Sequence, residues 1–338
     1  MKRRAFLKTV GGAAGVAALG VPEIFAAGEA ETVAGMPRRV LGRTGQKVSV
    51  VGFPGLSLFH TDQEKGTAAL HDAFERGVNY FDVAPNYGNG DAEIKMGIGL
   101  QGLERSKYFL ACKTHKRDKA GAQMELELSL QRLKTDHFDL YQLHHLVRPA
   151  EVKEVFAADG AMTPILKARE QGKIKYIGFS AHTTKAALEA MKTFQFDTVM
   201  FPINFVEFYN RNFGKEILAL ANEQGMGVLA IKPLSWGKYP KDAPKTHDWW
   251  YSSVEDPQHV ELAVRFSLSQ KGVAAVIPTS FVDLLDKTIE AAKMFRPLDV
   301  AGGEQLKHMA ANRESIFLAE ENQVAMDHPH GNPAWRHA

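Results

Sequence analysis

Short runs of apolar and β-branched residues alternate along the chain with longer segments whose apolar residues recur at helical spacing. Runs of the first kind predict buried strands, and segments of the second kind predict amphipathic helices that pack against them. When the segment 47–51 is counted as the lead into the first strand, the pattern predicts eight strands, at 47–51, 78–82, 108–113, 138–144, 174–179, 198–201, 227–231 and 273–277.

Helices are expected in the intervals between these strands. The first follows Thr61 and Asp62, which form a capping candidate, and stops at Gly77, a residue type that ends helices. The expected helices cover 62–76, 121–133, 162–171, 184–193, 214–224, 256–270 and 282–295, with one more at 303–319 outside the repeat.

This order of elements predicts an α/β fold, a (β/α)8 TIM barrel. Segments 38–41 and 47–50 flank a Gly-containing turn and predict an N-terminal β-hairpin. A doubly wound open sheet is the alternative, but no G-x-G-x-x-G motif follows any expected strand. We expect the barrel to cover 37–300, and an extra C-terminal helix and a tail, disordered at its end, to cover 301–338.

Residues 1–30 are similar to a twin-arginine (Tat) signal peptide. Arg3 and Arg4 precede Phe6-Leu7-Lys8 after one spacer, and a Gly/Ala-rich apolar stretch follows. That stretch is too short for a stable membrane span, and the small residues at 26–30 allow cleavage. We therefore expect the twin-arginine translocase to export the folded protein to the periplasm. A leader that stays attached as a membrane tether and an ordinary basic N-terminus are the alternatives.

Composition narrows the function classes further. The 41 basic and 39 acidic residues nearly balance, so no basic field for nucleic acid is expected. Cys112 is the only cysteine, which excludes an internal disulfide, and strand alternation beside Lys113 points its thiol away from the barrel interior. We expect no metal site, since the C-terminal histidines have no metal-binding spacing: His308, His328, His330 and His337. The oligomeric state does not follow from the sequence.

Four polar residues lie at or just after the ends of successive expected strands, where the active site of such a barrel is found. They are Asp82, Tyr87, Lys113 and His144. Each also has a purely structural interpretation: a helix cap for Asp82, a loop residue for Tyr87, a surface ammonium for Lys113 and a core imidazole for His144. Their convergence on one mouth favours a catalytic set.

Proton transfer is the chemistry that such a set supports. A phenol with a pKa near ~10 exchanges its proton poorly at neutral pH. A neighbouring Lys113 ammonium would lower the pKa of Tyr87, and the Asp82 carboxylate would keep Lys113 charged. A neutral His144 would orient a carbonyl oxygen or relay the proton.

This arrangement resembles the aldo-keto reductase superfamily, whose members are (β/α)8 barrels with an Asp, Tyr, Lys, His tetrad. The resemblance covers nearly the whole chain after the leader, and it rests on 40–45, the segment from Phe81 to Gly88, and 277–280. It implies that Tyr87 is the general acid and base. By the same resemblance, Lys113 and Asp82 tune Tyr87, and His144 orients the carbonyl.

The resemblance also implies a nicotinamide nucleotide, NADP(H) or NAD(H), bound without a Rossmann domain. Several family contacts are replaced: Ala181-His182 follow Ser180 in place of Asn, Met200 stands for Gln, and no Arg occurs in 279–285. His182 or Asn204 could supply amide contacts and Lys232 or Lys287 a phosphate charge, although surface or core roles are equally open. The cofactor candidates are Ser180, His182, Asn204, Lys232, Pro233, Leu234, Thr279, Ser280 and Lys287.

The substrate end is expected in the strand-end loops. The longest loop, 232–255, is rich in aromatic residues that would suit a sugar ring or another flat ligand, or would pack on one another. The substrate candidates are Phe53, His60, His145, Trp236, Trp249 and Trp250.

These observations predict an oxidoreductase that transfers hydride between a nicotinamide nucleotide and an aldehyde, ketone or sugar substrate. Two alternatives stay open. One is an enzyme that retains its nucleotide permanently and cycles between two substrates. The other is a catalytically silent barrel that serves as a sensor or partner subunit.

Overall fold

The computed structural model describes residues 31–278 and 280–325. The predicted leader at 1–30, the cofactor candidate Thr279 and the tail at 326–338 lie outside the described residues. Within the described part, no helix is both long enough and apolar enough to cross a membrane.

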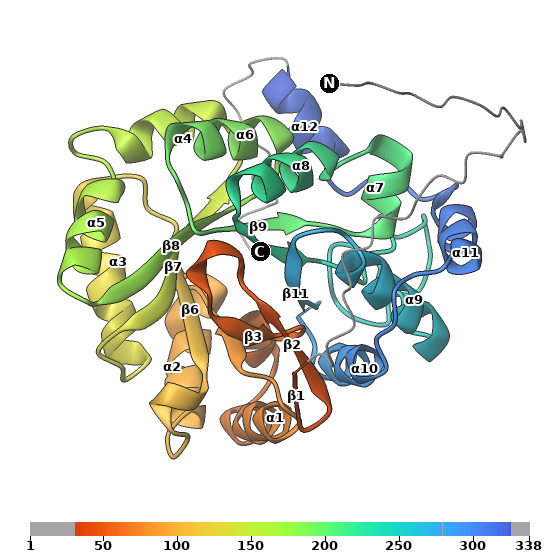
Figure 1. The fold of residues 1–338 in the computed structure, drawn as a ribbon, viewed down its shortest axis with the longest axis horizontal. Coiled ribbons are helices and arrows are strands. Elements are labelled where there is room, and N and C mark those ends of the chain that lie inside the picture. The colour runs from red at the N-terminus through yellow and green to blue at the C-terminus, as the bar shows by residue number, and fades with distance from the viewer. Residues whose placement is uncertain (1–30, 279, 326–338) are drawn as a thin grey trace, which may run out of the picture. The chain divides into compact units, whose positions relative to one another are not determined.

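Eight parallel strands form the barrel, and each pairs with its neighbour in sequence order (Figure 1). The ring closes where Val51 bridges Val276 in parallel and the Val276 N–H donates to the Val50 carbonyl at 2.9 Å. This confirms the predicted (β/α)8 barrel. The strands are β4 (Gly52–Pro54), β5 (Tyr80–Asp82), β6 (Phe109–Thr114), β7 (Phe138–Leu146), β8 (Ile174–Ala181), β9 (Thr198–Pro202), β10 (Gly227–Ile231) and β11 (Val273–Ile277).

Strand alternation divides the apolar side chains into an inner and an outer core. Tyr80 packs inside the barrel with Phe109 and Leu140, while Phe81 and Cys112 pack outside it against the helices. The Asp82 side chain, two residues after the inward-facing Tyr80, therefore points into the barrel at the end of its strand. The outward position predicted for the Cys112 thiol is confirmed.

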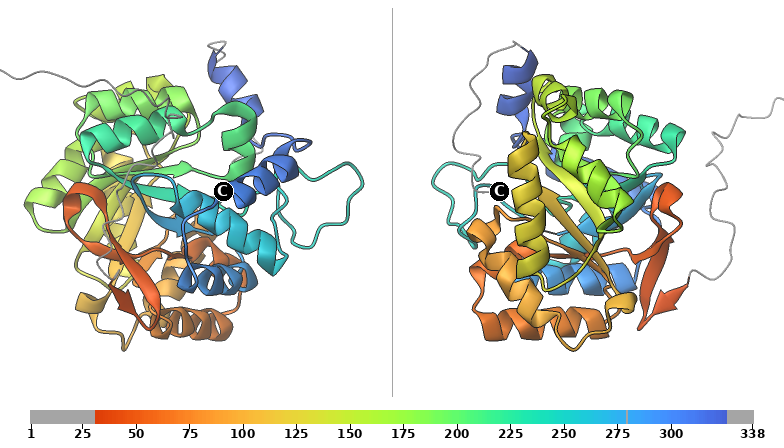
Figure 2. Two further views of the ribbon diagram at one scale, coloured as in Figure 1. Left: turned by 45° about the vertical axis from the view of Figure 1, so that its right-hand side comes forward. Right: turned by 90° about the vertical axis from the view of Figure 1, so that its left-hand side faces the viewer.

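The N-terminal hairpin closes the amino end of the barrel. It comprises β1 (Thr32–Val33), β2 (Met36–Val40) and β3 (Lys47–Ser49), which pair antiparallel. Leu41 and Val48 extend the inner core from below. In Figure 2 the hairpin and the long loop after β10 lie on opposite sides of the barrel. Segment 47–51 leads into the first barrel strand, as expected: 47–49 is a strand of the hairpin, Val51 bridges Val276, and the barrel strand itself starts at Gly52.

Helices surround the barrel between the strands. Three of them were not predicted: α2, α4 and α7. The helices are α1 (Gln63–Glu75), α2 (Asp91–Gly99), α3 (Lys119–Arg132), α4 (Pro149–Phe156), α5 (Met162–Glu170), α6 (Thr184–Thr193), α7 (Phe205–Arg211), α8 (Lys215–Gln224), α9 (Pro257–Leu268), α10 (Val282–Lys293), α11 (Val300–Ala310) and α12 (Leu318–Ala325).

The C-terminal segment contains two helices where the sequence predicted one over 303–319. The helix is interrupted between α11 and α12, where the backbone and a side chain of the connecting segment bind the buried Glu207 carboxylate. Glu207 accepts hydrogen bonds from the Ser315 hydroxyl at 2.6 Å and from the Ile316 N–H at 2.8 Å. The Glu321 carboxylate then accepts from the Thr184 N–H at 2.5 Å and fixes α12 at the first turn of α6.

Candidate active site at the carboxyl ends of the strands

A pocket opens at the carboxyl ends of the barrel strands, and it gathers most of the polar residues that the sequence singled out. Apolar side chains of Leu56, Met200, Ile231 and Ile277 line it together with Pro54, Gly55, Tyr251 and Pro278. Its polar or aromatic lining comes from the predicted site residues Asp82, Tyr87, His144, Ser180, His182, Lys232, Trp249 and Ser280.

Lys113 lies fully buried at the side of this pocket and joins Asp82 to Tyr87. Its Nζ donates to Asp82 Oδ2 at 2.5 Å, to the Val83 carbonyl at 3.2 Å and to the Tyr87 hydroxyl oxygen at 3.4 Å. Asp82 and Lys113 point inward because each stands two residues after an inward-facing strand residue. Tyr87 begins the short 3-10 helix Tyr87–Gly90 after β5, which turns its ring back over the mouth.

Burial and charge compete at these three groups. Burial lowers the pKa of Lys113, but the Asp82 carboxylate and Tyr87 raise it more, so the lysine stays charged. Burial raises the pKa of Tyr87 by more than the Lys113 ammonium lowers it, and the Asp82 charge raises it further. The expectation of a net lowering of the Tyr87 pKa is therefore wrong: the pocket keeps the phenol protonated at neutral pH.

His144 faces Tyr87 across the pocket, with their rings edge to face and the centroids 5.7 Å apart. Burial lowers the pKa of His144 well below its usual value, and the nearby Lys113 and His115 add to this effect. The imidazole is consequently neutral, as the sequence analysis expected. A neutral imidazole can donate a hydrogen bond to a carbonyl oxygen without competing for the proton of Tyr87.

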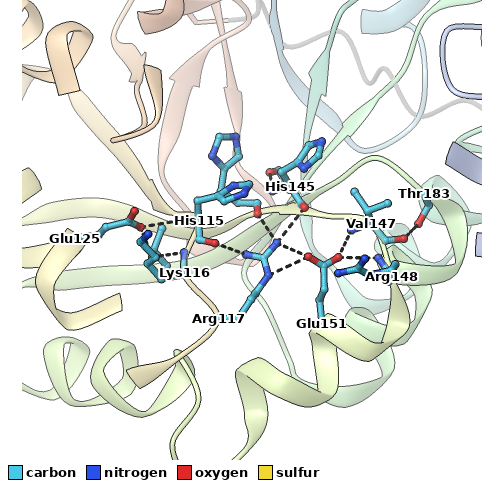
Figure 3. Close-up of polar contacts among 12 residues, drawn as sticks. His115, Lys116, Arg117, Glu125, His145, Val147, Arg148, Glu151 and Thr183 are labelled. Carbon is cyan, nitrogen blue, oxygen red and sulfur yellow. Dashed lines mark hydrogen bonds and ion pairs between the residues drawn. The ribbon is translucent and has the colours of Figure 1, made fainter. Parts of the chain in front are cut away.

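A bulge at the end of β7 sets the positions of His144 and His145. The pairing with β8 shifts register between Leu143 and Leu146, and His145 has a φ of 58°, in the left-handed region. Arg117 holds this bulge: its Nη2 donates to the carbonyls of His144 at 2.9 Å and His145 at 3.1 Å (Figure 3). The Glu151 carboxylate pairs with Arg117 at 3.1 Å, so the clamp is itself anchored.

The cofactor candidates divide into two groups. Ser180, His182, Lys232 and Ser280 line the pocket. Asn204 instead caps α7, its Oδ1 accepting from the Glu207 N–H at 3.0 Å. The remaining candidates do not line the pocket: Pro233 and Leu234 are buried, and Lys287 is half-buried on α10.

Of the substrate candidates, Trp249 lines the pocket, and His60 contacts its ring with centroids 5.6 Å apart. His145 lies behind His182, and their ring centroids are 4.2 Å apart. Trp250 packs edge to face on Tyr251.

Two substrate candidates were wrongly placed at the mouth. Phe53 points outward from β4 and packs on Phe81 in the outer core, because strand alternation puts it on the helix side. Trp236 turns toward α11, where its Nε1 donates to the Met309 carbonyl at 3.2 Å and the Arg313 guanidinium lies 3.5 Å from its ring centroid.

Sequence reasoning missed two residues close to the site. The His115 ring lies 5.8 Å from that of His144, and its place two residues after Lys113 at a strand end is a signal that could have found it. Glu320 on α12 is buried near Lys232, and burial raises its pKa to about 7 although the lysine opposes this. Burial likewise lowers the pKa of Lys232 to about 8. No local sequence motif indicates Glu320, because its proximity to Lys232 depends on where α12 packs against the barrel.

The barrel and its strand-end pocket fix the fold and the place of the site, and the comparisons with known proteins show the family. The family model "Aldo/keto reductase family" matches residues 54–301, so the chain belongs to the aldo/keto reductase family. Members of this family use nicotinamide cofactors.

The sequence identity between this chain and individual relatives is low. The chain is 27% identical to L-galactose dehydrogenase of Arabidopsis thaliana over 269 residues, covering 71% of this chain and 82% of the relative. It is 28% identical to the uncharacterized oxidoreductase YqkF of Bacillus subtilis over 322 residues, covering 85% of this chain and 100% of the relative. The holo form of aldo-keto reductase AKR11C1 from Bacillus halodurans shares the fold, with a TM-score of 0.68, 24% identity and coverage of 85% and 99%.

Proposed function

We propose that this protein interconverts a carbonyl compound and an alcohol, with a nicotinamide nucleotide as hydride donor or acceptor and Tyr87 as general acid and base. The observation that carries the proposal is the contact chain from Asp82 through the buried Lys113 to the Tyr87 hydroxyl. The substrate class proposed is an aldehyde, a ketone or a sugar, and the similarity to L-galactose dehydrogenase supports sugars among these.

The bound nucleotide supplies hydride to the carbonyl carbon, or accepts it in the reverse reaction. In the reducing direction, the Tyr87 hydroxyl gives its proton to the carbonyl oxygen, which becomes the alcohol hydroxyl. The Lys113 ammonium stabilises the phenolate that remains. His144, held by the clamped bulge, donates a hydrogen bond that fixes the direction of the carbonyl oxygen.

The lining residues fit the nicotinamide end of such a cofactor. Met200 and Ile231 line the pocket and would offer an apolar surface to the nicotinamide ring. Ser180 Oγ accepts a hydrogen bond from the His145 N–H at 2.8 Å, so its own hydroxyl proton is free to donate to the carboxamide. The adenosine end lies, by resemblance, near Ser280. Because no Arg occurs in 279–285 and the first turn of α10 carries the Asp283 carboxylate, we propose a preference for NAD(H) over NADP(H).

Contacts across the mouth favour the variant in which the nucleotide is retained. His60 stacks on Phe281 with centroids 5.0 Å apart, which connects the first loop to the segment before α10. On the same side, His247 of the long loop reaches Asp283 with its Nε2 3.1 Å from Oδ1, and its ring lies 4.2 Å from that of Phe281. We call His60, His247, Trp249 and Phe281 the aromatic clasp. A nucleotide lying beneath this clasp would leave slowly.

Release of nucleotide on denaturation tests this proposal. We expect about one nicotinamide nucleotide per chain in the supernatant of denatured protein, and tighter binding of NADH than NADPH when stripped protein is titrated. His60→Ala should lose its nucleotide during purification because one side of the clasp is gone, whereas His308→Ala on the exposed face of α11 should keep it. Absence of copurified nucleotide together with absence of binding in the titration would refute the hydride-transfer proposal.

We also propose that the protein is exported through the twin-arginine pathway with its nucleotide already bound. The support is the pair Arg3 and Arg4 followed by Phe6-Leu7-Lys8. A periplasm lacks a dependable pool of free nucleotide, so loading before export would solve the supply of cofactor.

Cell fractionation measures the export. The full chain should be found, shortened, in the periplasmic fraction, and the double variant Arg3→Lys, Arg4→Lys should stay in the cytoplasm at full length. If both chains remain cytoplasmic, the export proposal is wrong, while the enzymatic proposal is unaffected.

A further inference from the structure

Three side chains from separate parts of the chain converge beside the pocket: His145, His182 and Glu320. One potential ligand atom from each lies within 4.8 Å of the other two. His182 and Glu320 are each 4% exposed, and His145 is half-buried. Two imidazoles and one carboxylate form a donor set that binds divalent transition metals.

Each of the three residues carries one buried polar atom without a hydrogen-bond partner. Within residues 31–278 and 280–325, His145 Nε2, His182 Nδ1 and Glu320 Oε2 are all buried without a hydrogen bond. Buried polar atoms are almost always satisfied, so three orphans in one place call for a ligand. Nothing in the proton-transfer chain of Asp82, Lys113 and Tyr87 requires them.

Backbone contacts hold the two histidines in place. The Arg117 clamp fixes the carbonyl of His145, and the His145 N–H donates to Ser180 Oγ at 2.8 Å. The His182 N–H donates to the Leu146 carbonyl at 3.0 Å. Their imidazole planes stand at 83° to each other. The ligand platform on the barrel is therefore preorganised.

Glu320 lies beside the two histidines because residues before and after it in the chain hold α12 against the barrel. On one side, Phe317 is fully buried and stacks on Phe213 with centroids 5.2 Å apart. On the other, Glu321 binds the first turn of α6 through the Thr184 N–H. Around a tetrahedral zinc ion with bonds of ~2.1 Å, donor atoms are ~3.4 Å apart, so atoms that lie within 4.8 Å of one another need to close by at most about 1.4 Å.

We propose that His145, His182 and Glu320 bind one divalent transition-metal ion of the zinc class, which fastens α12 to the barrel beside the carbonyl pocket. The chain separation of the ligands explains why no metal motif is visible in the sequence. The Lys232 ammonium opposes binding, because its Nζ lies 3.5 Å from His182 Nε2 and is a like charge to the ion.

Metal titration of the full chain, stripped with a chelator, tests the proposal. We expect isothermal titration to show one tight Zn²⁺ site per chain, and Co²⁺ to give the visible absorption of a tetrahedral complex. Glu320→Gln should weaken Zn²⁺ binding by at least about 100-fold, since even outer-shell losses cost 10- to 100-fold. Glu314→Gln is the matched control: the same charge is removed from an exposed side chain that contacts only Lys238 among the described residues, and Zn²⁺ affinity should stay within about twofold.

Thermal stability and the Zn²⁺ affinity of a Lys232 variant test the same site independently. Zn²⁺ should raise the Tm of the wild type and Glu314→Gln but not of Glu320→Gln. Lys232→Met should bind Zn²⁺ about tenfold more tightly or better, because a repelling charge is gone. Adventitious binding to other histidines would persist unchanged in Glu320→Gln. If Glu320→Gln and the wild type bind alike, or Lys232→Met fails to tighten binding, the metal site is refuted.

Discussion

Tyr87→Phe is expected to lower kcat for carbonyl reduction by about 10²- to 10⁴-fold, the range typical for losing a positioned general acid. The substitution removes only the hydroxyl, the atom that lies 3.4 Å from Lys113 Nζ, and keeps the ring that faces His144. Nucleotide affinity should change little. Steady-state turnover of any carbonyl that the wild type reduces, together with a nucleotide titration, measures both effects.

Tyr176→Phe serves as the matched control. Its hydroxyl donates to the Thr44 carbonyl at 3.0 Å, at the hairpin end of the barrel, so the same atom is lost far from the pocket. We expect unchanged kcat in this variant. Unaltered turnover in Tyr87→Phe would show that another group supplies the proton.

The raised pKa of Tyr87 gives the two reaction directions opposite pH dependences. Reduction needs the protonated phenol, which burial preserves through neutral pH and which is lost only as the pH rises through the raised pKa. Oxidation of the alcohol needs the phenolate, so its rate should climb with pH over the same range. Tyr87→Phe should flatten both profiles.

Lys113→Met should destabilise the fold as well as abolish turnover. It leaves the Asp82 carboxylate buried without the partner that now donates to it at 2.5 Å. Breaking a buried ion pair from one side costs about 3–5 kcal/mol in the free energy of unfolding. Urea denaturation of the wild type and the variant at neutral pH measures the loss.

Two companion variants identify the cause. Lys175→Met removes a half-exposed ammonium whose Nζ lies 2.8 Å from Asp139 Oδ1. This loss should lower the free energy of unfolding by at most about 1 kcal/mol. The double variant Asp82→Asn, Lys113→Met should regain much of the stability, because no unpaired charge is left, but none of the activity. If Lys113→Met is no less stable than Lys175→Met, the buried ion pair does not have the assigned role.

The strand-end rule made the catalytic side chains predictable. Asp82, Lys113 and His144 could be placed at one mouth because side-chain alternation and parallel strand order are local, repeating properties. The same rule predicted the outward thiol of Cys112. The rule does not extend to His145, because a bulge breaks the alternation there and the ring packs against that of His182.

Local sequence thus determined the barrel, its hairpin and the residues at its strand ends, since hydrophobic periodicity and turn residues act over a few positions. The tertiary structure alone decided three things: that Trp236 packs away from the mouth, that burial outweighs Lys113 at Tyr87, and that Glu320 lies beside two histidines. Each depends on the sum of contacts between segments distant in the chain, and no local pattern encodes that sum.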